Sequence, residues 1–532
     1  MLLTSGLFFF LRAANVFDVC GRPKWKSKEP RSPNPHELAR NYKHFVLVRV
    51  VSWIVFWNLI LQASVMLIRP TIMKFGGTSV ADAQAFERVA QLVSVELDSL
   101  PIVVTSAMSG VTDALVSCFE AAGQPDAVAR ELDRHFERHQ QVADELISVA
   151  EARRFAETID QARSKLTRLL DQVCSVPGSA ILKDEVLSLG EQLASQLLTA
   201  VLHAHGLLVK HVDAREVIVT NEEHGQAGPL MPQTTVRAKA NLQRLLEARQ
   251  IPVVGGFIAA AENGNTTTLG RGGSDYSAAI IGAALNAREV QIWTDVSGVL
   301  TADPRVVPEA TTVPVLSYQE AAELAYFGAK VLHPKTIQPA VERGIPVRVC
   351  NSREPDEAGT LIVGESDAAP QTIKAIAHKD GITTLQVTSA RMLGAYGFLR
   401  ALFEVFDRHR TVVDVVTTSE VSVSLSIDDA GALAELIPEL EQLGVVEIEG
   451  PRTIVSVIGA GLRNTPGIAA RVFSSISDIN VSMISFGSSS VNLTFMVEAE
   501  NARETITRLH RVCFENHHRA RSGATEAKRA AV

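Results

Sequence analysis

The stretch from Thr267 to Asn286 constrains the fold of this chain most. It reads TTLGRGGSDYSAAIIGAALN and follows an apolar, β-rich run, Ile251–Ala259. The pattern predicts a buried strand, a glycine-rich turn and an alanine-rich helix over Tyr276–Ala287, with Ser274 or Asp275 capping the helix. Such a turn presents bare backbone N–H groups beside the positive end of a helix dipole, so it suits an anion.

Arg271 places a cation inside this turn. Its planar guanidinium can hold a carboxylate or a phosphate through two parallel hydrogen bonds. A glycine cluster by itself would be an ordinary turn. Arg, Gly, Gly, Ser and Asp together within Gly270–Asp275 favour a ligand site instead.

Length and composition limit the class of protein. The chain has 532 residues, enough for three or four domains of ordinary size, and 46% of them are hydrophobic. The net charge of −8 argues against a nucleic-acid partner. Five cysteines without a CxxC pair or a metal-binding spacing indicate a reduced, cytoplasmic protein.

The first 65 residues differ in composition from the rest, and two interpretations compete. Val50–Ile68 is a run of nineteen residues without a charge, about the length that spans a bilayer, although polar residues within it weaken that reading. As a membrane anchor, it would keep the basic segment before it on the cytoplasmic side. We favour the alternative, in which 1–65 is an extension outside the working protein, which begins at Met66 or Met73.

Strands and helices then alternate. Thr71–Phe75 predicts a strand that runs into a Gly-Gly turn and a helix, and Pro101–Asp113 repeats this plan. Leu187 opens another expected helix, with Glu191 near its first turn, and Val290–Asp295 is a further strand. Alternation of this kind predicts an α/β sandwich whose site lies at the carboxyl ends of the strands.

Seven motifs occur in an order and spacing that resemble the aspartate kinases, from about Thr71 to the C-terminus. They are KFGGTSV at Lys74–Val80, TSAMSGVT at Thr105–Thr112, SLGE at Ser188–Glu191, GRGGSD at Gly270–Asp275, WTDVSGV at Trp293–Val299, TADPR at Thr301–Arg305 and GAKVLHP at Gly328–Pro334. The resemblance is to the monofunctional, lysine-sensitive type.

The resemblance implies a fold and a reaction. The fold is an amino-acid-kinase (carbamate-kinase-like) α/β/α sandwich over 71–365, followed by two ACT regulatory domains. The reaction transfers the γ-phosphoryl group of ATP to the β-carboxylate of L-aspartate, giving 4-phospho-L-aspartate. That product leads to lysine, threonine, methionine and diaminopimelate.

The chemistry of this reaction agrees with the residues present. A carboxylate nucleophile is ionised at pH 7, so it needs no general base. The site must supply alignment and must neutralise phosphate charge. By resemblance, Lys74 and Lys330 are the catalytic cations, Mg²⁺ bridges the phosphates, and Asp275 orients Lys74 or the metal shell.

The resemblance also implies two sets of binding residues. Arg271 would pair with a carboxylate of aspartate and Glu191 with its ammonium group. The substrate set is Thr112, Glu191, Arg271, Gly272, Gly273 and Ser274. The nucleotide set is Lys74, Gly76, Gly77, Ser106, Thr294, Asp295, Leu300, Arg305, Lys330 and Val331. The family often has tyrosine where Leu300 stands, which puts a ring contact there in doubt.

The C-terminal third contains an internal repeat after a polar boundary at Gly364–Thr372. At an offset of 70, Gly397–Phe403 matches Gly467–Phe473, and Val421–Ile427 matches Val491–Val497. Each unit predicts a strand, a loop, a helix and further strands. This resembles paired ACT domains, with expected ranges of 375–445 and 450–515 and a disordered tail over 516–532.

The first repeat unit contains an expected effector pocket. By resemblance its residues are Met392, Ala395, Phe398, Leu399, Val413, Asp414, Ser419 and Glu420. Lysine is the expected effector, with threonine as the alternative, because Ala395 stands where serine is common. Asp414 lies in an apolar run, so we expect a cationic partner for it. The alternative is that these are core and edge residues of a small sheet.

Other functions compete with a feedback-regulated aspartate kinase. One is a kinase for another acidic amino acid such as glutamate. Another is an amino-acid sensor that keeps the fold without catalysis, and a third is a membrane-tethered scaffold. The retained Lys74, Arg271, Asp275 and Lys330 argue against the sensor. ACT domains usually pair across subunits, so we expect a homodimer or a dimer of dimers.

Overall fold

The computed structural model describes residues 69–122, 125–328, 332–364, 373–394, 396–428 and 430–515, all within the unit that spans Ile68–Val532. The predictions for residues 1–65, for the span Val50–Ile68 and for the tail 516–532 therefore lie outside the described residues. Among the helices described, none combines the length and the apolar character needed to cross a membrane.

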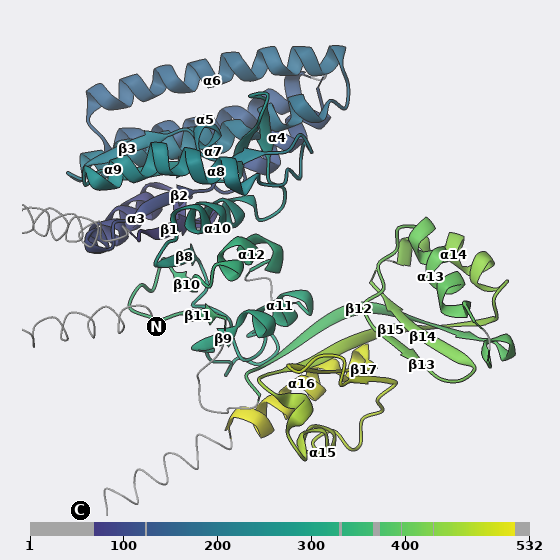
Figure 1. Cartoon of the computed structure of the whole chain (residues 1–532). Helices are drawn as coiled ribbons and strands as arrows, with labels where there is room; N and C mark the ends of the chain where they lie inside the picture. The colour runs from purple at the N-terminus through teal and green to yellow at the C-terminus, as the bar shows by residue number, and fades with distance from the viewer. Residues whose placement is uncertain are drawn as a thin grey trace, which may run out of the picture. The chain divides into compact units, whose positions relative to one another are not determined.

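An eight-stranded sheet forms the centre of the N-terminal part of this unit (Figure 1). Each pair from β3 to β10 is parallel, whereas β10 and β11 are antiparallel. The carboxyl ends of the parallel strands therefore share one edge. The strands, in order across the sheet, are β3 (Val209–Val212), β5 (Ile251–Gly255), β2 (Ile102–Thr105), β1 (Thr71–Phe75), β8 (Glu289–Thr294), β10 (Val347–Asn351), β11 (Thr360–Val363) and β9 (Val315–Ser317).

Alternation of side chains along the strands gives the sheet a core on each face. In β1, Ile72 packs into one cluster while Met73 and Phe75 pack into the other. The second cluster includes helices α3 (Ala83–Val95), α4 (Val111–Glu120), α5 (Pro125–Leu146), α6 (Val149–Ser175) and α7 (Ala180–Ala204). The first includes α8 (Met231–Ala238), α9 (Arg244–Glu247), α10 (Gly273–Leu285), α11 (Tyr318–Tyr326) and α12 (Pro334–Glu342).

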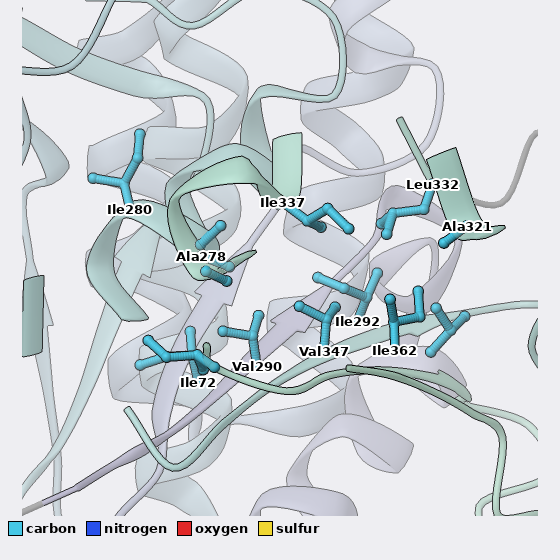
Figure 2. Close-up of a cluster of buried hydrophobic side chains, with 14 of the residues drawn as sticks. Ile72, Ala278, Ile280, Val290, Ile292, Ala321, Leu332, Ile337, Val347 and Ile362 are labelled. Atoms are coloured by element: carbon cyan, nitrogen blue, oxygen red, sulfur yellow. The ribbon is translucent and has the colours of Figure 1, made fainter. Parts of the chain in front are cut away.

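Figure 2 shows the first of these cores. Ile72, Val290 and Val347 come from neighbouring strands, and Ala278 of α10 and Ile337 of α12 face them. Helices on both faces of a mostly parallel sheet make a three-layer α/β/α sandwich. This confirms the fold class predicted from the sequence.

Within the apolar run Ile251–Ala259, the buried strand ends in glycine, as the sequence predicted, and a second strand begins after it. β5 ends at Gly255, and the chain turns before β6 (Ile258–Ala261), which pairs with β7 (Thr266–Thr268) and β4 (Val219–Thr220) in a separate sheet. At Gly256 a Cβ atom would lie 2.7 Å from the Cβ of Ser274, so only glycine lets the turn approach α10 this closely.

Two predicted helix starts were wrong. The N-cap of α10 is Gly272, with φ of 72°, and no side chain caps that end; Ser274 and Asp275 lie inside the first turn instead. Glycine adopts this left-handed backbone without strain. Helix α7 begins at Ala180, so Glu191 lies in its middle, not near its first turn.

The C-terminal part contains a six-stranded sheet of order β13-β14-β12-β15-β17-β16. Its elements are β12 (Ala375–Thr388), α13 (Phe398–Arg408), β13 (Val416–Thr418), β14 (Ser422–Ile427), α14 (Leu433–Leu440), β15 (Val445–Ile458), α15 (Ile468–Ser474), β16 (Met483–Phe486), β17 (Asn492–Glu498) and α16 (Ala502–His510).

The predicted repeat is present in this sheet. Helices α13 and α15 begin 70 residues apart, as do strands β14 and β17. Each helix follows a glycine with positive φ, 83° at Gly397 and 78° at Gly467, so even the backbone geometry of the helix start repeats.

The two repeat units are interleaved, not consecutive. The first half of β12, Ala375–Lys379, pairs with Ile454–Ile458 of β15, whereas the second half also pairs with β14. Ile376 packs with the hydrophobic core of the second unit. The division at 375–445 and 450–515 therefore does not follow the sheet, because two long strands, β12 and β15, serve both units.

Candidate active site

A cavity of about 1030 Å³ opens at the carboxyl ends of β1, β2 and β5. Its walls come from the segments after these strands, from α7 and from the turn that leads into α10. The predicted site residues that line it are Lys74, Gly77, Ser106, Thr112, Glu191, Arg271, Gly272, Gly273, Ser274 and Asp275.

Lys74 and Asp275 form an ion pair in this cavity. The Lys74 Nζ lies 2.6 Å from an Asp275 oxygen, and the two side chains are 10% and 16% exposed. Lys74 stands near the end of β1 and Asp275 in the first turn of α10. The carboxylate therefore fixes the lysine ammonium where the strand end meets the positive end of the helix dipole.

Glu191 supplies a buried carboxyl group that forms no ion pair within the described ranges of the chain. It is 3% exposed, and its Oε2 has no hydrogen-bond partner among the described residues. Burial, opposed by a hydrogen bond from the Ala107 backbone, raises the pKa of Glu191 to about 8. Once ionised, this carboxyl group would be a partner for a ligand ammonium group.

Arg271 is the exposed cation of the same cavity. Within the described part of the chain, its guanidinium makes no ion pair. The preceding and following glycines, Gly270 and Gly272, have φ of 76° and 72°, which turns the chain sharply at this residue. The cavity thus contains a cation and a neutral buried acid as two separate binding groups.

The predicted nucleotide residues do not all line this cavity. Thr294 is the last residue of β8, which pairs directly with β1, and its hydroxyl donates to the next residue, Asp295, over 3.1 Å. Gly76, Leu300 and Arg305 are likewise outside the lining; Arg305 is exposed and paired with Asp303. Lys330 and Val331 lie outside the described residues.

The expected effector residues lie around α13 and the strands beside it. Met392, Phe398 and Val413 pack against the core of the first repeat unit. Leu399, Ser419 and Glu420 are exposed, and Ala395 lies outside the described residues.

The cationic partner expected for Asp414 comes from the chain itself. Lys379 Nζ lies 2.9 Å from the Asp414 carboxylate, and the Tyr326 hydroxyl donates to its other oxygen. The Asp414 side chain is 1% exposed, and Lys379 also pairs with Asp428 over 2.9 Å. Burial of Asp414 is therefore no evidence, by itself, for a bound ammonium group.

Comparisons with known proteins identify the family. A model of the amino acid kinase family matches residues 69–351, and a model of the ACT domain matches residues 455–512. Lysine-sensitive aspartokinase 3 of Escherichia coli is 37% identical over 459 residues, which are 84% of this chain and 99% of that protein. The chain belongs to the aspartokinase family.

Solved aspartokinase structures agree with this assignment. Aspartokinase III of E. coli in complex with aspartate and ADP is 36% identical, with a TM-score of 0.71, and the match covers 84% of this chain and 100% of that one. The same enzyme in complex with lysine and aspartate gives 37% identity, a TM-score of 0.73, and coverage of 84% and 99%. The predicted family is confirmed.

Several residues of this aspartokinase cavity were missed by sequence reasoning. On α7, Asp184, Leu187 and Glu191 are spaced i, i+3 and i+7, so the helix period could have placed Asp184 beside Glu191. His224 lies in a turn between β4 and α8, where no local pattern marks it. The additional lining residues include Asp113, Lys183, Asp184, His224, Gln226, Phe257 and Thr268.

Proposed function

We propose that this aspartokinase transfers the γ-phosphoryl group of ATP to the β-carboxylate of L-aspartate in the cavity described above. The observation that supports this most is the pairing of opposite binding groups in one cavity, the exposed Arg271 and the buried Glu191. Aspartate has an ammonium group and two carboxylates. One carboxylate would bind Arg271 and the ammonium would bind Glu191, which leaves the second carboxylate to react.

Lys74 supplies the charge that phosphoryl transfer requires. Negative charge on the transferring group and on the leaving ADP must be stabilised, and a fixed ammonium group does this without reorganisation. The pair with Asp275 keeps Lys74 in place before the nucleotide binds. Ser106, Gly76 and Gly77 would border the phosphates, and Thr294, Asp295, Leu300, Arg305, Lys330 and Val331 the remainder of the nucleotide.

Mg²⁺ would bind together with ATP. No group of three or more His, Cys, Asp or Glu side chains in the described ranges could hold a metal ion. In nucleotide sites, Mg²⁺ usually keeps several waters and binds one or two carboxylates together with substrate phosphates. When bound, it would supply positive charge that neutralises the phosphates.

A direct assay tests this function. The purified chain, with ATP and Mg²⁺, should form a hydroxamate from aspartate in the presence of hydroxylamine, and should release ADP at the same rate. Glutamate, which is one methylene longer, should react far more slowly. If glutamate reacts and aspartate does not, the enzyme is a kinase for another acidic amino acid.

The raised pKa of Glu191 predicts how aspartate binding depends on pH. At pH 7 most Glu191 carboxyl groups in the empty cavity are protonated, because the pKa is about 8. The substrate ammonium requires the ionised form, so the aspartate KM should fall about fivefold between pH 7 and pH 8. Glu191→Gln should raise the KM and remove this pH dependence, which initial rates at several pH values would measure.

The same group predicts the stability of the ligand-free protein. Its folded-state pKa lies above the ordinary value of 4.5, so the folded state retains a proton that the unfolded state loses. Its contribution to stability is complete below about pH 4.5 and is lost as pH rises toward and through 8. Thermal unfolding should show a smaller loss over this range in Glu191→Gln; an equal loss in both proteins would contradict the assignment.

We also propose that lysine is the effector and that it binds at Asp414, with Met392, Ala395, Phe398, Leu399, Val413, Ser419 and Glu420 around it. The support is the resemblance of this segment to lysine-sensitive aspartokinases and the partial exposure of its apolar side chains. An incoming ammonium group would have to share or replace Lys379 at Asp414. The regulatory units would pair as a homodimer or a dimer of dimers, which light scattering measures.

Asp414→Ala is expected to weaken lysine inhibition by about 10- to 100-fold, the effect of losing a hydrogen bond to a charged group. Activity would be titrated with lysine, with threonine and with both. Asp428→Ala is the matched control, because it removes the other carboxylate that Lys379 contacts and leaves Asp414 intact. Lysine inhibition that is unchanged in Asp414→Ala would falsify this pocket, and inhibition by threonine alone would reassign the effector.

A further inference from the structure

Asp184 is a buried carboxylate in the wall of the active-site cavity to which the reaction assigns no role. It lies on α7 seven residues before Glu191, on the same helix face, and its side chain is 1% exposed. A carboxylate this deeply buried is costly unless hydrogen bonds compensate for the lost water. Its partners therefore indicate why it is there.

Asp184 joins two segments that are far apart in the sequence. One oxygen accepts from the Thr268 hydroxyl over 2.5 Å. The other accepts from the Gly225 N–H over 3.1 Å and contacts the His224 Nδ1 over 2.8 Å. Because a carboxylate oxygen can only accept, the His224 Nδ1 carries the proton of this bond.

Both segments lie directly against the Arg271 turn. Thr268 ends β7, three residues before Arg271, and its carbonyl accepts from the Ala227 N–H over 3.0 Å. Gly225 approaches the other side of the turn: a Cβ atom on Gly270 would lie 3.1 Å from the Gly225 carbonyl oxygen. The turn that presents the exposed Arg271 thus packs against the two segments that Asp184 joins, the end of β7 and the His224–Gly225 turn.

We propose that Asp184 is a positioning residue for aspartate binding. It holds the His224–Gly225 turn to the end of β7 and so fixes the direction of the turn that presents Arg271. His224 contributes through its Nδ1 hydrogen bond to Asp184. The inference rests on the proposed binding of aspartate by Arg271, which Asp184 itself does not contact.

Asp184→Asn tests this role with almost no change in size. The amide cannot accept from all three donors, so we expect the aspartate KM to rise about tenfold, since misplaced binding groups of this kind typically cost up to ~10²-fold. The ATP KM should stay unchanged and kcat should stay within about threefold. If this variant does not fold, Thr268→Val, which removes one of the three donors, provides the same measurement.

Glu185→Gln is the matched control. Glu185 is the next residue on α7, and it accepts from Thr266 over 2.5 Å and from Lys165 over 2.8 Å, but it does not line the cavity. Its loss should lower the thermal unfolding temperature without changing either KM. An equal rise of the aspartate KM in Glu185→Gln would mean that the effect is general destabilisation, and it would overturn the proposal.

Two variants of His224 distinguish its hydrogen bond to Asp184 from a direct contact between the imidazole ring and the substrate. Asparagine can donate from its amide nitrogen to Asp184, as the Nδ1 of histidine does, whereas alanine cannot. His224→Ala should therefore raise the aspartate KM, and His224→Asn should restore most of the parent value. If both variants raise the aspartate KM equally, the ring itself contacts substrate, and the role assigned to the His224–Asp184 hydrogen bond is wrong.

The outcome for Arg271→Ala distinguishes failure of this inference from failure of the proposed function. If Arg271→Ala leaves the aspartate KM unchanged, the proposed aspartate site is wrong and the inference fails with it. If Arg271→Ala raises that KM and Asp184→Asn does not, only the positioning role of Asp184 is overturned.

Discussion

Replacing Lys74 with alanine is expected to lower kcat by about 10²–10³-fold, the usual effect of removing one preorganised electrostatic contact from a transition state. The aspartate KM should change much less. Lys74 lies at the strand end in the cavity, 10% exposed, with its ammonium held by Asp275. Its charge therefore acts on phosphate charge that develops during transfer, and steady-state kinetics with ATP and aspartate varied in turn would measure the effect.

Two further variants make the Lys74 result interpretable. Lys74→Ala leaves the Asp275 carboxylate buried without its partner, so the double variant Lys74→Met, Asp275→Asn should recover thermal stability but not kcat. Lys183→Ala removes a second lysine of the cavity wall, one whose ammonium lies 5.7 Å from the centre of the Phe119 ring. It should lower kcat far less. A large rise in the aspartate KM with kcat unchanged would reverse the role given to Lys74.

Arg271→Ala is expected to raise the aspartate KM by about 10- to 100-fold, while kcat at saturating aspartate falls by only a few fold. Hydrogen bonds to a charged group typically contribute about 1.5–3 kcal/mol, which corresponds to this range. Arg271 is exposed and makes no ion pair within the described part of the chain, so its loss should not unfold the protein. Initial rates over a wide range of aspartate concentration would separate the two parameters.

Arg271→Lys is the informative control for that experiment. Lysine keeps the charge but loses the planar pair of donors that fits a carboxylate, so its KM should lie between those of the parent and the alanine variant. If the aspartate KM of Arg271→Lys is as high as that of Arg271→Ala, the paired hydrogen bonds of the guanidinium matter more than its charge. A fall in kcat with an unchanged aspartate KM would instead indicate that Arg271 contacts the phosphate and not the aspartate carboxylate.

Most of the kinase domain could be predicted from the sequence, because its strands, turns and helices are marked by local sequence patterns. Around Gly270–Asp275, a strand, a glycine turn and a helix follow one another within about twenty residues. The same order occurs from β1 to α3. Parallel strands bring such turns to one edge, so Lys74 and Arg271 were expected near each other, and the family resemblance added Glu191. The cavity lining brings them together, although their chemical roles stay predictions.

Local patterns also had limits within this domain. Ser274 and Asp275 are good capping residues, yet the N-cap of α10 is Gly272, and Asp275 in the first turn pairs with the Lys74 ammonium instead. Propensity gives a weak preference of about 1 kcal/mol for a cap, and a buried ion pair in a cavity can outweigh it. By resemblance, Asp275 was expected to orient Lys74 or the metal shell, and the structure pairs it with Lys74.

By itself, the sequence determined the order of elements, the two regulatory repeats and the family, since these depend on short motifs and on a fixed offset of 70. The tertiary structure decided the partners of the buried charges: Asp184 with His224 and Thr268, and Asp414 with Lys379. It also decided that β12 serves both repeat units. The reason is the same in each case. A buried charge or an unpaired strand edge takes whichever partner the packing of distant segments brings within hydrogen-bond distance, and no local pattern encodes that distance.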